Sequence, residues 1–135
     1  MSIYLLLGRA IGTAAIACSL SLGAAAEQAP AQHQATVRMG PAKGFFSEKC
    51  LTFPGATRVE YRFTAPHPVD FNVHLHRDDQ TLYPVKLQAV KALKAMLDVE
   101  PVQEYCFMWT SNSAVAAEWE LKFGYTDQGK QSPRE

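Results

Sequence analysis

The sequence lacks the features that mark several broad classes of protein. Its 13 basic and 13 acidic side chains leave a formal net charge of zero, and they form no run of like charge. Nucleic acid needs a basic face and anionic lipid attracts a polybasic run, so we expect neither as a partner. No second apolar segment after residue 26 is long enough for a membrane span, so we expect no transmembrane segment in the mature chain.

Motifs of catalysis are also missing. The serines have no Gly-x-Ser-x-Gly setting, and the cysteines form no Cys-x-x-Cys pair. A His-x-His pair with scattered aspartates is not a hydrolase signature. Glu118 and Glu120 share one face of a predicted strand and are expected to be solvated. We therefore expect a protein that is not an enzyme.

The N-terminus has the pattern of an export signal. Arg9 precedes the apolar run Ala10–Leu22, and Ala24-Ala25-Ala26 then provides small residues for cleavage. The run is about 13 residues long, which is too short for a stable bilayer span. The sequence thus predicts a signal peptide over 1–26 and a periplasmic or secreted protein. A lipoprotein processed at Cys18, within Ala15-Ile16-Ala17-Cys18, is the alternative.

Two cysteines, Cys50 and Cys106, remain after removal of the signal peptide. An even pair in an oxidising compartment usually forms a disulfide. Such a bridge would close a loop of about 57 residues, which the chain-entropy model values at roughly 4 kcal/mol. Two free thiols are the alternative.

The mature chain is expected to hold one domain. Residues 27–36 are rich in Ala, Gln and Pro and predict a flexible leader, and the polar residues 127–135 predict a flexible tail. Between them, residues 37–126 contain short segments of strict apolar–polar alternation, which indicates strands with one buried face. These segments are Val59–Thr64, Phe71–His76 and Trp119–Phe123. Several such strands separated by turns predict an all-β, antiparallel β-sandwich.

Residues 86–97 are compatible with either a helix or a strand. Residues 86–97 are rich in Leu, Ala, Lys and Met, and Leu87, Val90, Leu93 and Leu97 fall on one helical face. Propensity alone therefore predicts a short helix there.

Three segments in order resemble the GOLD (Golgi-dynamics) domain, the lumenal β-sandwich of cargo receptors of the early secretory pathway. They are an early cysteine at Cys50, the strand pair Val59–Thr64 and Val69–His76, and Tyr105–Trp109 followed by Asn112. The resemblance covers Cys50 to Tyr125. It implies a GOLD-like or jelly-roll-like sandwich in which Cys50 pairs with Cys106 and Leu93–Val99 is a strand. We therefore lean towards a strand at the end of 86–97.

The chain also resembles small exported bacterial proteins of unassigned role. The shared segments are Phe71–His76, Tyr83-Pro84-Val85 and Tyr105–Trp109. No coiled coil, membrane span or sorting tail follows the last predicted strand, so vesicle sorting is not implied. What the resemblance implies is a disulfide-linked sandwich whose relatives bind proteins or lipids. We expect another exported protein or a small ligand as the partner.

His74 and His76 are the sharpest candidates for a site. Two residues apart on a strand they share a face, and imidazoles placed in this way can converge on Cu or Zn. A third ligand must come from elsewhere, and His67 is the nearest histidine in the sequence. The alternative is that both histidines decorate a solvated face and that the protein has no cofactor.

The aromatic residues of one predicted strand offer a second surface. Tyr105, Phe107 and Trp109 lie on one side of the strand, where they form either core or an apolar platform for a ligand. Asn72, on the histidine stripe, is a further candidate. We expect a non-catalytic, exported binding or assembly module, with a periplasmic Cu or Zn protein using His74 and His76 as the alternative.

Overall fold

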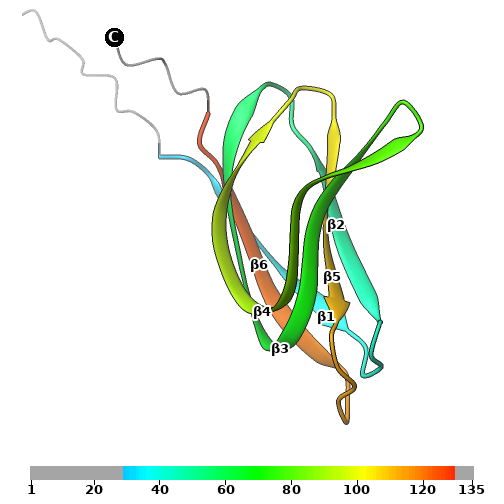
Figure 1. Ribbon diagram of the computed structural model, residues 1–135. Helices are drawn as coiled ribbons and strands as arrows, with labels where there is room; N and C mark the ends of the chain where they lie inside the picture. Colours follow the sequence, from blue (N-terminus) through cyan, green and yellow to red (C-terminus); the bar gives the residue numbers. More distant parts are fainter. Residues whose placement is uncertain (1–28, 130–135) are drawn as a thin grey trace, which may run out of the picture.

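The computed structural model describes residues 29–129, which form six antiparallel β-strands (Figure 1). The strands are β1 (Gln32–Met39), β2 (Phe46–Thr52), β3 (Thr57–Arg77), β4 (Gln80–Val99), β5 (Glu104–Ser111) and β6 (Trp119–Asp127). The predicted signal peptide and Cys18 lie outside the described residues, as do residues 130–135. No helix that could span a membrane occurs in the described part.

One long hairpin, β3–β4, belongs to both halves of the fold. The first part of β3 pairs with β6, and β6 pairs with β1. The second part of β3 pairs with β5, and β5 pairs with β2. β4 follows β3 through both halves. The sheet therefore curls over on itself, and the all-β antiparallel prediction is confirmed.

The hairpin bends where β3 passes from one half to the other. The register between β3 and β4 shifts between Thr64 and Val69, where Pro66 and Pro68 cannot donate to a ladder. On the facing strand Ala89 has a φ of 52°, a left-handed conformation that interrupts a regular strand. The carboxylate of Asp70 accepts hydrogen bonds from the Ala89 backbone N–H at 2.9 Å and from the Asn112 side-chain amide at 2.8 Å. At this corner the two hydrogen bonds link β3 to β4 and to the residue that follows β5.

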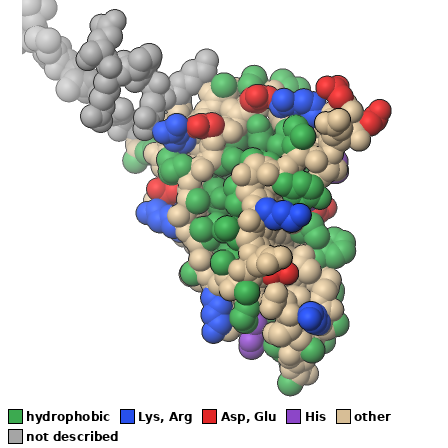
Figure 2. All heavy atoms as spheres, viewed as in Figure 1, with side chains coloured by type: hydrophobic (Ala, Val, Ile, Leu, Met, Phe, Trp, Pro, Cys, Tyr) green, Lys and Arg blue, Asp and Glu red, His purple; other side chains and the backbone are tan. Residues whose placement is uncertain are grey.

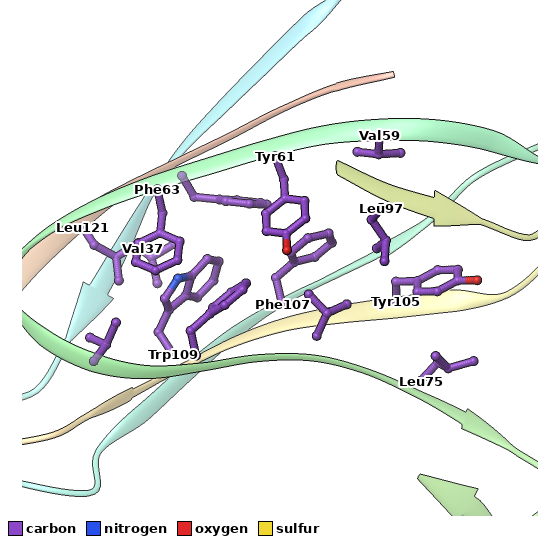
Figure 3. Packing of buried hydrophobic residues seen from close by; sticks show 14 of the residues in the cluster. Val37, Val59, Tyr61, Phe63, Leu75, Leu97, Tyr105, Phe107, Trp109 and Leu121 are labelled. Atoms are coloured by element: carbon purple, nitrogen blue, oxygen red, sulfur yellow. The ribbon is translucent and has the colours of Figure 1, made fainter. Parts of the chain in front are cut away.

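The core lies between the two halves. Figure 3 shows Tyr61 and Phe63 of β3 pointing towards Phe107 and Trp109 of β5. The rings of Tyr61 and Phe107 have centroids 5.2 Å apart, and those of Phe63 and Trp109 are 5.9 Å apart, both edge to face. Such edge-to-face pairs add to the burial of apolar area. The largest fully buried side chains are Trp109, Tyr61, Phe63, Phe71 and Phe107.

The helix that propensity predicts within 86–97 is wrong, and the strand implied for Leu93–Val99 is confirmed. The bend explains the misleading spacing. Leu87, Val90 and Leu93 are partly buried against the core at three-residue intervals because the strand is irregular between them. Beyond the bend the two-residue period returns, with Leu93, Ala95 and Leu97 packed against the core.

The predicted domain boundaries need one correction. β1 begins at Gln32, so the leader predicted over 27–36 is wrong for its second half. Gln32–Thr36 pair with β6 along their whole length, which supplies the hydrogen bonds that their weak apolar pattern does not suggest. At the other end β6 extends to Asp127, the first residue of the predicted tail.

The disulfide between Cys50 and Cys106 is present. Its cysteines stand directly opposite each other on β2 and β5, with Cα atoms 4.0 Å apart. Since β2 has its main contact with β5, the bridge fastens this edge strand to the body of the fold.

We expect removal of the disulfide to destabilise the domain. The double variant Cys50→Ser with Cys106→Ser should lose about 2–5 kcal/mol of unfolding free energy, since the unfolded chain regains the entropy of an open loop. Urea denaturation of both proteins measures the difference. A dithiol reductant should cause the same loss in the wild type and none in the variant. A loss below about 1 kcal/mol would contradict a stabilising role for the bridge.

Candidate functional site

The outer face of the second half carries most of the candidate residues. Two cross-strand rows meet there, because residues paired on neighbouring strands point to the same face. One row is Cys50, Cys106 and His74, and the next is Glu48, Met108 and Asn72. We call these residues, with His76 and Tyr83, the histidine face.

His74 is the centre of the histidine face. It is a buried residue, 8% exposed, on the outer side of β3. Its Nδ1 lies 2.8 Å from Oδ1 of Asn72. An amide oxygen can only accept, so Nδ1 donates and the neutral ring keeps its lone pair on Nε2. That Nε2 lies 3.7 Å from Oε2 of Glu48.

His76 and Tyr83 border His74. The rings of His74 and His76 have centroids 5.4 Å apart and are nearly perpendicular. Nδ1 of His76 lies 3.2 Å from the hydroxyl oxygen of Thr81. Tyr83 places its ring 5.8 Å from that of His74, and the ammonium of Lys86 lies 5.1 Å from the centre of the Tyr83 ring. His74 and His76 therefore lie side by side on β3.

His67 is not part of this group. It lies at the bend, where its ring packs edge to face against Trp119 with centroids 5.2 Å apart. It precedes His74 by seven residues on the same strand, a path of roughly 20 Å if extended. The prediction of His67 as the third ligand is therefore wrong.

The aromatic platform is also wrong as a binding surface. Tyr105 is 4% exposed, and Phe107 and Trp109 are each 0% exposed, so a ligand on the surface cannot reach them. They form core, which is the other interpretation that their pattern allowed. Asn72 is partly buried and orients His74.

Two groups of potential metal ligands gather at the disulfide. Glu48, His74 and Cys106 offer atoms within 4.8 Å of one another, and so do Cys50, Glu104 and Cys106. Metals bind the thiolate form of cysteine, and the disulfide removes it. With the bridge closed, His74 and Glu48 are the ligands that remain of the first group.

Sequence reasoning missed Glu48. The residue is 26 positions before His74 in the chain, and it reaches His74 because β5 stands between their strands with a defined register. The position of Glu48 two residues before Cys50 is a usable signal, since both must share a face. The β3–β5 register that completes the group has no such signal.

No protein-family model and no curated protein sequence matches this chain. Among solved structures the chain is similar to the C-terminal CBM6 module of LamC, a laminarinase of Zobellia galactanivorans. The identity is 13%, the match covers 68% of this chain and 99% of that chain, and the TM-score is 0.37. It is also similar to the Podospora anserina GH26-CBM35 β-(1,4)-mannanase.

For this mannanase the identity is 11%, and the match covers 77% of this chain but 29% of that chain, with a TM-score of 0.38. This chain therefore corresponds to under a third of the mannanase. Identities and TM-scores this low carry no information on the ligand of this protein.

The contact with Asn72 should select one tautomer of His74. We expect the metal-free protein at about pH 8 to hold His74 with the proton on Nδ1, since Asn72 offers only an acceptor there. Long-range ¹H–¹⁵N NMR of the ring nitrogens measures this. In Asn72→Ala the preference should weaken, whereas His33, an exposed histidine of β1, should give unchanged signals. A proton on Nε2 of His74 in the wild type would contradict this geometry.

Proposed function

We propose that this chain is a non-catalytic binding module of an exported protein and that its histidine face holds a transition-metal ion. The metal ligands would be Nε2 of His74, the carboxylate of Glu48 and one imidazole nitrogen of His76. Two imidazoles and a carboxylate are a donor set that suits Zn²⁺ or Cu²⁺.

One observation carries the proposal. Nε2 of His74 and Oε2 of Glu48 lie 3.7 Å apart, and in the neutral ring both atoms present lone pairs. A metal ion between the two atoms, or a proton on Nε2, would turn this contact into an attraction. Two ligands at about 2.1 Å from a Zn²⁺ ion stand slightly over 3 Å apart, so a small movement of Glu48 would close the site.

The neighbours of His74 have the properties of outer-shell groups. Asn72 fixes the ring and leaves Nε2 available, as hydrogen-bond partners of metal-binding histidines commonly do. At His76, donation from Nδ1 to Thr81 would likewise leave a lone pair on Nε2. Met108 lies in the adjacent row, and a thioether is a soft group suited to Cu⁺.

A partner bound by strand addition receives less support. β4 pairs with β3 alone, so its other edge is open. That edge carries Pro84, the left-handed Ala89 and three lysines, which are features that protect edge strands from pairing. These features favour the histidine face over the β4 edge as the proposed binding surface.

Export and family membership belong to the same proposal. The predicted signal peptide and the Cys50–Cys106 disulfide are compatible with a periplasmic or secreted protein. The likeness to GOLD domains adds that such sandwiches act through binding. Elemental analysis of protein purified from its native compartment would identify the metal.

Calorimetric titration with Zn²⁺ and Cu²⁺ tests the proposed function. We expect binding at about micromolar affinity or tighter with one ion per chain, and weaker binding at lower pH because protons compete for the imidazoles. His74→Ala and Glu48→Gln should each reduce affinity by about tenfold or more, since a ligand of the ion is lost.

His67→Ala is the matched control, because it removes a histidine of the same strand that lies away from the proposed ligands. It should bind metal as the wild type does. Circular dichroism of each variant verifies that the fold is intact. Equal affinity of His74→Ala, His67→Ala and the wild type would overturn the metal site.

A further inference from the structure

The outer face of the first half of the fold is hollowed. Here a hollow of about 690 Å³ spans four strands, β1, β6, β3 and β4. Two cross-strand rows form its floor: Gln34, Gly124, Arg62 and Lys94 in one, and Thr36, Lys122, Thr64 and Ala92 in the other. Figure 1 shows β4 bowing strongly on this side of the molecule. The volume is in the range of small-molecule sites.

The lining of the hollow is basic and contains no acidic side chain. Arg62, Lys94 and Lys122 line it together with the hydroxyls of Thr36 and Thr64. Glu60, in the next row, lies 3.4 Å from Lys94 and balances that charge. Lys122 donates to the hydroxyl of Thr36 at 2.9 Å, and no ion pair is found for it among residues 29–129.

Arg62 is the strongest indication of a ligand. It is partly buried, and among residues 29–129 no ion pair or side-chain hydrogen bond is found for it. Arg58, four residues earlier on the same face, has its partner: its guanidinium binds both oxygens of Asp98 at 2.7 and 3.1 Å. This pairing lowers the pKa of Asp98 and raises that of Arg58. The Arg62 guanidinium could hold a carboxylate through two hydrogen bonds in the same way, and no carboxylate of residues 29–129 lies within ion-pair distance of it.

The guanidinium of Arg62 lies over Gly124, which has no side chain to occupy that space. A Cβ atom at position 124 would stand 3.2 Å from the Arg62 guanidinium carbon and 3.1 Å from the His33 carbonyl oxygen. Both distances are tighter than ordinary contacts of a Cβ atom. The absent side chain therefore lets the guanidinium rest on the sheet surface, which presets its position.

The rows beside the hollow are not uniformly basic, since Glu60 lies next to Lys94. On the face drawn in Figure 2, basic and acidic side chains are scattered among hydrophobic atoms. A long polyanion needs many phosphate or carboxylate contacts, and the net charge of zero does not favour one. The hollow instead concentrates two unneutralised cations, Arg62 and Lys122, at diagonal positions about 7–8 Å apart.

We propose that this hollow binds a small organic anion with two carboxylates. Arg62 would take one carboxylate through two parallel N–H···O bonds, which its planar fork suits. Lys122 would take the other, and the threonine hydroxyls would bind its remaining oxygens. This site is independent of the histidine face, so either can fail without the other.

Titration with glutarate, followed by calorimetry and by NMR of backbone amides, tests the proposal. We expect saturable binding that weakens as salt is added, with shifted amides at Thr36, Arg62 and Lys122. The neutral diamide of glutarate should not bind, and butyrate, with one carboxylate, should bind at least about tenfold more weakly. If inorganic phosphate bound as tightly as glutarate, the proposal of a dicarboxylate ligand would be overturned.

Three variants distinguish the effect of the Arg62 charge from the effect of the position of its guanidinium. Arg62→Gln removes the charge, and Gly124→Ala keeps the charge but displaces the guanidinium; each should lower affinity by about tenfold. Lys49→Gln, a matched loss of charge on β2 in the other half, should bind as the wild type does. Circular dichroism checks each fold. Wild-type affinity in Arg62→Gln would overturn the site, and so would equal losses in Lys49→Gln.

Discussion

The corner of the β3–β4 hairpin is the constraint on which the rest of the fold depends. A straight hairpin of this length would leave one face of a flat sheet in water. Here Pro66 and Pro68 interrupt one strand, and the left-handed Ala89 interrupts the other. The Asp70 carboxylate holds the corner by accepting from Ala89 and from Asn112. Because the hairpin turns, β6 and β5 pair with different parts of the same strand, and their inner faces close over one core.

The corner also keeps the same set of β3 side chains, those of the odd-numbered residues, facing the core on both sides of the bend. Along β3 the odd-numbered residues Val59–Phe63 are buried before the bend, and the odd-numbered residues Val69–Leu75 are buried after it. The even-numbered residues therefore stay on the outside in both halves. Arg62 occupies such a position in one half, and His74 occupies one in the other. The core needs every inner position, whereas the outer positions are free to carry binding groups.

This regularity explains how much the sequence could predict. The apolar–polar alternation around Tyr61, Phe71 and Leu121 predicts the strands and the residues of the core. The even number of cysteines in the mature chain predicts the disulfide. At residues 86–97 the bend imposes a three-residue spacing that imitates a helix, so propensity fails there. Glu48 and the hollow at Arg62 depend on registers between strands distant in the chain, which no local pattern encodes. His74 and His76 could be found because both lie on one strand.

Two rigid elements set the geometry of the histidine face. The disulfide holds β2 against β5, which fixes Glu48 two residues from Cys50. The hydrogen bond from His74 to Asn72 fixes the ring on β3. The strand register thus brings Glu48 and His74 within reach of each other, with Oε2 and Nε2 3.7 Å apart. Pre-positioned side chains lose little conformational entropy on binding, and this is the physical basis of the site proposed here.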